Sequence, residues 1–373
     1  MRVIIVGAGV AGCAVAWDLA SRGADVVVID ARGIGKGATF ASAGILAPRI
    51  EGHSAELLRL GLCSLGLYDG FISRLKHDAG REIEYERNGT LQIALQEDET
   101  ASLQRSAAAL ATGHIPHSWL DARHTRRVEP GLTNEALGAL LVPEHGYVSV
   151  PALIDALADA ARARRARFLT TPVVEVLGGS SPRVVTADEE IAGDAVVIAA
   201  GSWSSDLAAG SVRPHASAVG QAREAAVRPI RGQLLHLQMP QRAASHVLWG
   251  PDCYIVPWRD GSVLVGATME DVGFDESATV AGVQHLTTAA TRLLPALAGA
   301  TFAGVRVGLR PATSDELPVI GSSTMMEGVV YATGHYRNGV LLAPLTALLV
   351  SDLVLENRAR TELALTRPDR LGL

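Results

Sequence analysis

A glycine motif near the N-terminus has the spacing of a phosphate-binding turn. Gly7, Gly9 and Gly12 form the pattern G-x-G-x-x-G within the sequence GAGVAG. The first glycine permits a tight turn, the second lets a diphosphate approach the backbone, and the third lets a helix pack closely on a strand. Free N–H groups at the helix N-terminus would bind the phosphates. The motif predicts a dinucleotide site that includes Val10 and Ala11, and the alternative is a glycine-rich turn without a ligand.

Asp30 is the residue that selects among dinucleotides. It ends the second apolar segment of the chain and is followed by Ala31. An acidic residue at this point accepts a hydrogen bond from a ribose hydroxyl, and its negative charge would repel the additional phosphate of NADP. FAD and NAD remain as candidate cofactors.

The residues around this motif have the pattern of a strand–helix–strand unit. Residues 2–6 and 24–30 are continuous apolar strands, and residues 11–22 between them have helical spacing. Strands that are apolar on both faces are typical of a parallel sheet covered by helices. We expect residues 167–175 and 194–200 to be further strands of that sheet, with a helix over residues 151–167.

A second group of segments favours a different sheet. Residues 85–95, 231–237 and 253–269 have mixed or alternating polarity and frequent turn residues, which predicts antiparallel strands. A chain of 373 residues also favours two domains. We therefore expect an α/β fold with a discontinuous Rossmann-like cofactor-binding domain (residues 1–84, 145–220 and 305–373) and a second, mainly antiparallel β-sheet substrate domain (residues 85–144 and 221–304).

Composition and charge exclude several classes of protein. With 48% hydrophobic and 19% charged residues, the chain is expected to be globular rather than disordered. A formal net charge of -6 gives no general attraction for nucleic acid or an anionic membrane. Cys13, Cys63 and Cys253 lack CxxC spacing, so they indicate neither a disulfide framework nor a zinc site and fit a reducing cytoplasm.

Two apolar stretches could belong either to the hydrophobic core or to a membrane span or export signal. The N-terminal stretch carries only Arg2 as its charge and contains the three glycines, so a dinucleotide turn explains it better than a lipoprotein signal ending at Cys13. Residues 340–355 are interrupted by Pro344 and Asp352, which predicts a buried helix rather than a membrane span. We expect a cytoplasmic protein without a membrane span.

Two polar clusters are weak candidates for ligand sites. His114 and His117 form an HxxH run without a third ligand nearby, which favours a solvated loop over a metal site. A basic run at residues 162–167 is expected to be a solvated helix end rather than an anion site. We expect no metal and no nucleic-acid partner.

Three further segments resemble the D-amino acid oxidase family of flavoproteins. They are residues 37–45, 194–203 and 334–339, with the sequences GATFASAGI, DAVVIAAGSW and GHYRNG. Within that family, the sequences CYIVP, VGATM and GLRP, which begin at residues 253, 265 and 308, are most similar to the glycine oxidases, a branch associated with thiazole formation for thiamine. The resemblance spans nearly the whole chain and is weakest between about residues 97 and 140.

The resemblance implies that the cofactor is non-covalently bound FAD. Small residues from Ala38 to Ile45 would run beside the flavin, with Thr39 able to donate to a phosphate, and N–H groups of residues 335–341 would face the N1 and O2 edge of the ring. Covalent attachment in the related sarcosine oxidases uses a Cys near the position of Arg310, and no cysteine follows Cys253 here. The other implied contacts are Ala43, Gly44, Val173, Ala200, Gly201, Trp203, His335, Tyr336, Arg337, Asn338, Gly339, Val340 and Leu341.

The resemblance also implies an amino acid substrate that binds through its carboxylate. A planar Arg offers two parallel donors to a carboxylate, and the family pattern gives this role to Arg310, which precedes Pro311. Tyr254 would add a hydroxyl donor, and Arg337 would help to position the substrate or close the flavin site. Without the resemblance, each residue also has an alternative structural role. Arg310 could form an inter-domain salt bridge, Tyr254 could be a core aromatic residue, and Arg337 could form a structural ion pair.

The implied reaction is oxidative deamination of glycine and other small amino or N-methylamino acids, such as sarcosine and D-alanine, to an oxoacid, ammonia or an amine, and hydrogen peroxide. Hydride transfer to flavin requires alignment and an electron sink, so no catalytic side chain is expected. Two alternatives stay open: a D-amino acid dehydrogenase that reduces a quinone, and a flavin-dependent tRNA-modification enzyme. The preferred substrate, the electron acceptor and the oligomeric state are also open.

Overall fold

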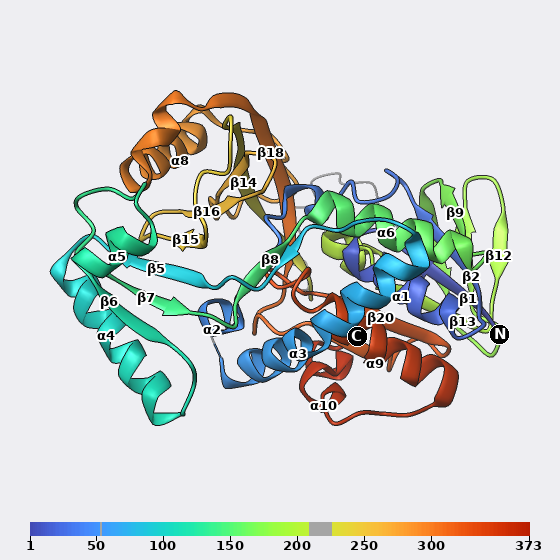
Figure 1. Cartoon of the computed structure of the whole chain (residues 1–373). Helices are drawn as coiled ribbons and strands as arrows, with labels where there is room; N and C mark the ends of the chain where they lie inside the picture. The colour runs from blue at the N-terminus through green and yellow to red at the C-terminus, as the bar shows by residue number, and fades with distance from the viewer. Residues whose placement is uncertain (53, 209–225) are drawn as a thin grey trace.

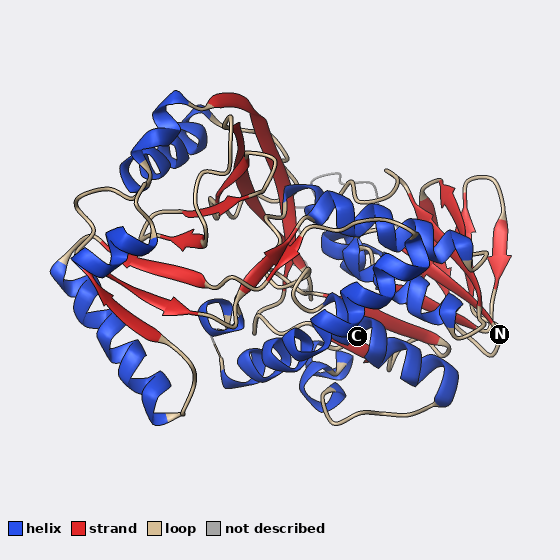
Figure 2. Ribbon diagram, viewed as in Figure 1, coloured by secondary structure: helices blue, strands red, loops and turns tan. Residues whose placement is uncertain are grey.

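The computed structural model describes residues 1–52, 54–208 and 226–373. In this part of the chain, two large sheets lie toward opposite ends of an elongated molecule, with α1 and α6 at one end and α4 and α8 at the other (Figure 1). Figure 2 shows that helices gather on one side of the sheet that contains the N-terminus. The α/β fold class with two different sheets is therefore confirmed.

The strand–helix–strand unit forms the centre of a six-stranded sheet in the described residues. Strands β1, β2, β13, β20 and β9 are parallel, and β19 is an antiparallel edge strand. The middle strands are buried on both faces, as their continuous apolar sequences predict. The order across the sheet is β19 (Val319–Ser322), β20 (Val329–Thr333), β13 (Ala195–Ile198), β1 (Arg2–Val6), β2 (Asp25–Asp30) and β9 (Arg167–Thr170).

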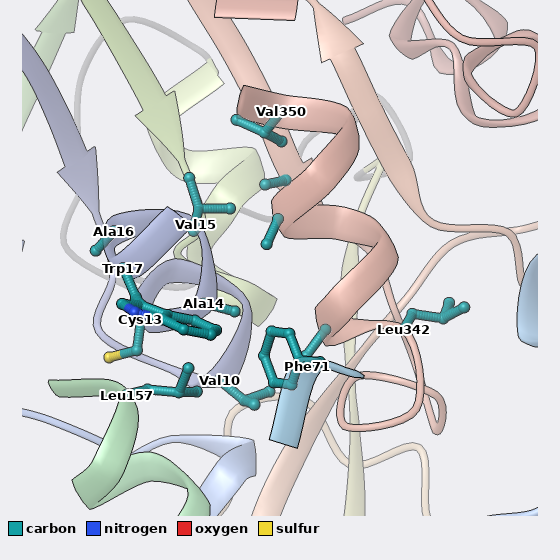
Figure 3. Packing of buried hydrophobic residues seen from close by; sticks show 14 of the residues in the cluster. Val10, Cys13, Ala14, Val15, Ala16, Trp17, Phe71, Leu157, Leu342 and Val350 are labelled. Atoms are coloured by element: carbon teal, nitrogen blue, oxygen red, sulfur yellow. The ribbon is translucent and has the colours of Figure 1, made fainter. Parts of the chain in front are cut away.

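Helices cover one face of this sheet. Trp17 of α1 is fully buried, and its ring meets Phe71 of α3 edge to face at a centroid distance of 5.1 Å (Figure 3). Val350 and Leu157 contribute to the same core from two further helices (Figure 3). Four helices supply most of this core: α1 (Val10–Ser21), α3 (Ala55–Ala79), α6 (Val150–Ala163) and α9 (Ala343–Glu356).

On the opposite face of this sheet, the strand expected over residues 167–175 is divided between two sheets. The apolar pattern predicts a single strand over residues 167–175, but β9 ends before Pro172, which lacks an N–H to donate to a sheet. The chain then joins a separate antiparallel sheet, in which Val176 and Val184 pack on Ile4 of β1. Among the described residues, three strands thus pack on this face: β10 (Val173–Leu177), β11 (Arg183–Thr186) and β12 (Glu190–Ala192).

The second large sheet has eight described strands, which are antiparallel except for the parallel pair β15–β5. One face packs on α8 (Val280–Leu293), where Leu235 and Ile255 meet Leu286. Two further helices, α4 (Glu97–Thr112) and α5 (Ala122–Val128), lie beside its far end. The strand order is β18 (Thr301–Ala312), β14 (Arg228–Gln238), β17 (Ser262–Gly266), β16 (Tyr254–Pro257), β15 (Val247–Trp249), β5 (Thr90–Ala94), β7 (Gly138–Val142) and β6 (Ser118–Asp121).

Short elements join the two sheets. A small antiparallel sheet contains β3 (Ile45–Leu46), β8 (Gly146–Val148) and β4 (Tyr85–Glu86). Strand β18 crosses the domain boundary expected at residues 304/305, and the boundary expected at 220/221 lies outside the described residues. The division into two discontinuous domains stays a prediction. The remaining elements are η1 (Ala38–Ala41), α2 (Pro48–Glu51), η2 (Gly201–Trp203), α7 (Ser204–Ala208), η3 (Pro295–Gly299), α10 (Leu363–Thr366) and η4 (Pro368–Leu371).

The long apolar C-terminal stretch forms α9, which begins at Ala343 and is largely buried. None of the described helices combines the length and the apolar character that crossing a membrane requires.

Helix α9 also carries a buried carboxylate whose removal should destabilise the fold. Asp352 is fully buried, and Oδ1 and Oδ2 accept from Arg22 Nη1 at 2.6 Å and Arg358 Nη2 at 2.7 Å, with Arg360 as a third donor. Burial would raise the pKa of Asp352, but these arginines outweigh it and lower the pKa to about 2. We expect Asp352→Asn to lower the free energy of unfolding by about 3 kcal/mol at pH 7, measured by urea denaturation.

The sign of the pH dependence follows from the lowered pKa. The carboxylate stabilises the fold fully above its unfolded pKa of about 4, and this contribution is lost as pH falls toward 2. The difference between wild type and Asp352→Asn should therefore narrow from pH 5 to pH 3. Glu356→Gln is the control, because Glu356 is 46% exposed in the same cluster and should cost less than about 1 kcal/mol. Equal losses in both variants at pH 7 would contradict the account.

Candidate functional site

A cavity among the described residues lies where the two large sheets meet. Its volume is about 630 Å³, within the usual range of about 300–1,000 Å³ for ligand sites. The carboxyl ends of β1, β2 and β13 border it. From β1 the chain continues to β2 on one side, whereas β13, which comes much later in the sequence, lies on the other side of β1. Open α/β sheets bind ligands at such a switch point.

The turn between β1 and α1 forms one wall and has the geometry that its glycines predicted. Gly7 has φ +112°, and a Cβ there would lie 2.3 Å from the carbonyl oxygen of Ala199. A Cβ at Gly12 would lie 2.0 Å from the carbonyl oxygen of Gly7, so the absence of a side chain lets the helix pack closely on the turn. Gly12 does not line the cavity. Gly9 does line it.

The N-terminus of α1 is open toward the cavity. Its N-cap residue, Gly9, has no side chain that could cap the helix, and the first turn contains no acidic residue. Val10 and Ala11 both line the cavity. The arrangement suits an anion, because N–H groups and the positive end of the helix dipole favour negative charge.

Asp30 lies at the cavity and also fixes the loop around it. Its Oδ2 accepts from the Ala8 N–H at 2.8 Å, and its Oδ1 accepts from the N–H groups of Arg32 and Gly33 at 2.8 and 3.0 Å. Among the described residues, Oδ2 accepts only the hydrogen bond from Ala8 and keeps a free lone pair, so a ribose hydroxyl can still donate to it. Ala31 lines the cavity beside it.

Segment 37–45 passes along the cavity as the family resemblance implied. Thr39 Oγ1 accepts from the Val10 N–H at 3.0 Å, which leaves the hydroxyl proton to donate to a ligand. Gly44 has φ +76°, and a Cβ there would lie 1.9 Å from the Val148 carbonyl oxygen. Phe40 is half exposed and stacks under Arg306 instead of entering the cavity. Ala38, Ala43 and Ile45 complete this lining.

The far end of the cavity contains a desolvated cation. Arg310 Nη1 donates to the carbonyl oxygens of Thr268 at 3.0 Å and Arg231 at 3.3 Å. No carboxylate in the described part of the chain forms an ion pair with Arg310, and burial lowers its pKa. Tyr254 lines the same end, and burial raises the pKa of its phenol, which stays protonated at neutral pH. Together they offer positive charge and a hydroxyl donor.

Arg337 differs from Arg310 because its charge is matched. Its Nη2 donates to Glu51 Oε1 at 2.9 Å, and its Nε lies 2.8 Å from Glu51 Oε2. The pair lines the cavity. Sequence reasoning missed Glu51, because the short helix α2 has no periodicity and nothing local indicates that its carboxylate turns inward.

The loop before α9 supplies the remaining wall. His335 turns its ring away, with Nε2 2.9 Å from Thr346 Oγ1, and burial lowers its pKa to about 4. Tyr336 has φ +48° and donates its hydroxyl to Met269 Sδ. Residues 335–340 line the cavity, whereas Leu341 is buried in the helical core. The helix predicted over residues 340–355 begins at Ala343.

The structure gathers the other implied contacts as well. Val173, Ala200, Gly201 and Trp203 line the cavity. The sequence did not indicate Arg32, which lies 4.4 Å from the Trp203 ring centroid and pairs with Glu276. All of the residues expected to contact cofactor or substrate, except Gly12 and Leu341, thus line one cavity.

The HxxH run of His114 and His117 lies apart from this site. His117 Nδ1 contacts the Ile115 carbonyl oxygen, and His114 is an exposed turn residue. Within residues 1–52, 54–208 and 226–373, no group of three or more His, Cys, Asp or Glu side chains could hold a metal ion.

Comparisons with known proteins agree with this geometry. A glycine oxidase of Geobacillus kaustophilus is 35% identical over 97% of this chain and 95% of its own length. A crystal structure of glycine oxidase from that species has a TM-score of 0.88, with 33% identity and 96% of each chain covered. A bifunctional ThiO/ThiG protein of Nostoc sp. is 34% identical over 96% of this chain, which spans about half of that protein (53%).

The family assignment rests on nearly the full length of the chain. The model of the family described as FAD dependent oxidoreductase (DAO) matches residues 2–353. This range contains the glycine turn, Asp30, Tyr254, Arg310 and the loop before α9. The chain therefore belongs to the DAO family of FAD-dependent oxidoreductases.

Proposed function

We propose that this protein oxidises glycine and other small amino or N-methylamino acids with FAD and oxygen. The observation that carries the proposal is Arg310, a desolvated cation without a carboxylate partner among the described residues, at the end of the cavity. Relatives named glycine oxidase support the same substrate class.

The reaction balances without a further reductant. The amino acid loses two hydrogens and becomes an imino acid, which water hydrolyses to an oxoacid and ammonia, or an amine from an N-methyl substrate. Oxygen takes up the two electrons and two protons as hydrogen peroxide.

The cavity fits FAD on three observations. The glycine turn leaves room for a diphosphate, the N-cap of α1 is a glycine without a capping side chain, and Asp30 can accept from a ribose. Thr39 and residues 38–45 would hold the ribityl and ring side, with residues 335–340 opposite. Bound FAD would supply the two-electron oxidation of the substrate.

The protein residues bind and orient the substrate. Nη1 of Arg310 is occupied by two carbonyl oxygens, which leaves Nε and Nη2 to bind a carboxylate. The Tyr254 hydroxyl would donate to the same carboxylate. Glu51 neutralises Arg337, and Glu276 pairs with Arg32. Arg310 is therefore the one cation without a carboxylate partner among the described residues that line the cavity, which supports a substrate with one carboxylate.

Two further parts of the proposal concern context. The similarity to one half of a ThiO/ThiG protein supports a role in supplying thiazole synthesis for thiamine. The free thiols of Cys13, Cys63 and Cys253 support work in a reducing compartment such as the cytoplasm.

A substrate screen tests the proposal directly. The purified flavoprotein should consume oxygen and form one peroxide per molecule of glycine, sarcosine or D-alanine oxidised. Oxygen uptake and peroxide would be measured together under steady-state conditions. Reduction of a quinone by these substrates without oxygen uptake would indicate the dehydrogenase alternative, and inactivity toward all small amino acids would refute the proposal.

Gly9→Val should weaken FAD binding. Its side chain would occupy the position past which the diphosphate runs, and a Cβ there would already lie 3.3 Å from Thr39 Oγ1. Overpacking of about 1–3 kcal/mol corresponds to about 5- to 150-fold lower affinity. Acid should release the non-covalent flavin into the supernatant, where its absorbance gives the occupancy.

Gly66→Val is the matched control, because Gly66 is exposed on α3 and a Cβ there would have no neighbouring atom within 4 Å. It should keep its flavin. Full occupancy in Gly9→Val would show that the diphosphate lies elsewhere, and flavin retained in the acid pellet of wild type would show covalent attachment.

Arg310→Leu should lose most activity on amino acids and keep its flavin. The substitution leaves the substrate carboxylate unpaired in a desolvated site, at a cost of about 2–5 kcal/mol, or about 30- to several-thousand-fold in kcat/KM. Methylamine, which is glycine without the carboxylate, should be affected far less. An equal loss on both substrates would make Arg310 structural, and no loss on either would point to Arg337 as the carboxylate-binding residue.

A further inference from the structure

Two buried glycines lie within strands near the substrate end of the cavity. Gly232 in β14 and Gly266 in β17 are buried, and neither has a φ in the left-handed region. A glycine inside a strand is less stable than alanine by about 0.5–1 kcal/mol. The presence of glycine at these two positions must therefore be explained by the side chains that pack over the face of the sheet there.

Strand register places both glycines on the face that carries Arg310 and Tyr254. Gly232 pairs with Gly308, two residues before Arg310 on β18. Gly266 pairs directly with Tyr254 of β16. Residues that pair across antiparallel strands share a face, as do residues two apart on one strand.

The space above each glycine is filled by one of the two substrate-binding side chains. A Cβ at Gly232 would lie 2.2 Å from Arg310 Nη2 and 2.3 Å from its Cζ. A Cβ at Gly266 would lie 2.4 Å from both Cζ and Oη of Tyr254. The guanidinium and the phenol ring therefore lie directly against the backbone of the sheet.

The hydrogen bonds of Arg310 agree with this placement. Its Nη1 donates to the carbonyl oxygen of Arg231, the residue before Gly232, and to that of Thr268, two residues after Gly266. The backbone below is held firmly, because Arg231 is buried and bound by Glu270. The strand cannot readily shift to make room for a methyl group.

We propose that Gly232 and Gly266 are positioning residues, which set the depth and orientation of the carboxylate-binding Arg310 and Tyr254 by leaving room for them against the sheet. The inference rests on the proposed function, since it assigns the substrate carboxylate to Arg310. An alanine at position 232 would lift the guanidinium away from both carbonyl oxygens and toward the substrate.

Gly232→Ala in the FAD-loaded enzyme tests the inference. A displacement of about 1 Å in a substrate-positioning group can cost about 100-fold, so kcat/KM for glycine should fall by about 10- to 100-fold. KM for glycine should carry most of the change, whereas kcat/KM for methylamine and the flavin content should stay close to wild type. Gly70→Ala, at an exposed position of α3 where a Cβ would have no neighbour within 4 Å, should change none of these quantities.

A double variant separates this role from a structural one. In an Arg310→Leu background, Gly232→Ala should cause no further loss with glycine, because the group that it displaces is absent. The same fold loss in both backgrounds would overturn the inference. If Gly232→Ala alone fails to fold, Gly232→Ala combined with Arg310→Ala should restore folding and flavin binding, and failure of that combination would also overturn it.

The outcome distinguishes the inference from the proposed function. Arg310→Leu could reduce kcat/KM for the substrate glycine more than for methylamine while Gly232→Ala does not. In that case the positioning role of Gly232 is wrong and the proposed function stands. If Arg310→Leu affects both substrates equally, the carboxylate role of Arg310 fails, and the inference fails with it.

Discussion

Arg310 is a partly buried guanidinium without a carboxylate partner in the described residues, and the substrate end of the structure must compensate its charge. Desolvating a cation is costly unless hydrogen bonds or an anion compensate it. Two backbone carbonyl oxygens hold Nη1 of Arg310, and both belong to strands or strand ends of the eight-stranded sheet. The remaining donors stay available, so the substrate carboxylate would complete the ion pair. The long, paired strands β14 and β18 provide the rigid support that this arrangement requires.

The cofactor end depends on close backbone contact instead of charge. At Gly7 and Gly44 a Cβ would overlap a carbonyl oxygen of a neighbouring segment, so the walls of the cavity are backbone packed on backbone. The eight-stranded sheet uses the same device, because Gly308 lets η1 approach β18, with Ala41 only 2.8 Å from where its Cβ would be. Small residues therefore bring the two sheets close enough to share one cavity.

Local sequence predicted the parts of the site that local geometry determines. The glycine turn, its flanking strands and Asp30 follow one another within 30 residues, so their relation is set by a single strand–helix–strand unit. The split of residues 167–175 into two sheets depended on Pro172, whose effect the apolar pattern concealed. The family resemblance indicated Arg310 and Tyr254, but their support by Gly232 and Gly266 depends on strand register. Glu51 was missed because only the tertiary structure brings it close to Arg337.

The most direct test of the account is a binding titration that involves no turnover. Glycolate has the carboxylate of glycine without its amine, and glycolamide replaces that carboxylate with a neutral amide. Each would be titrated into the FAD-loaded protein and followed through the visible flavin spectrum. The account predicts that glycolate perturbs the spectrum and binds at least about 30-fold more tightly than glycolamide, the equivalent of about 2 kcal/mol, and that Arg310→Leu abolishes the difference. Equal affinities in wild type, or a preference that persists in Arg310→Leu, would contradict it.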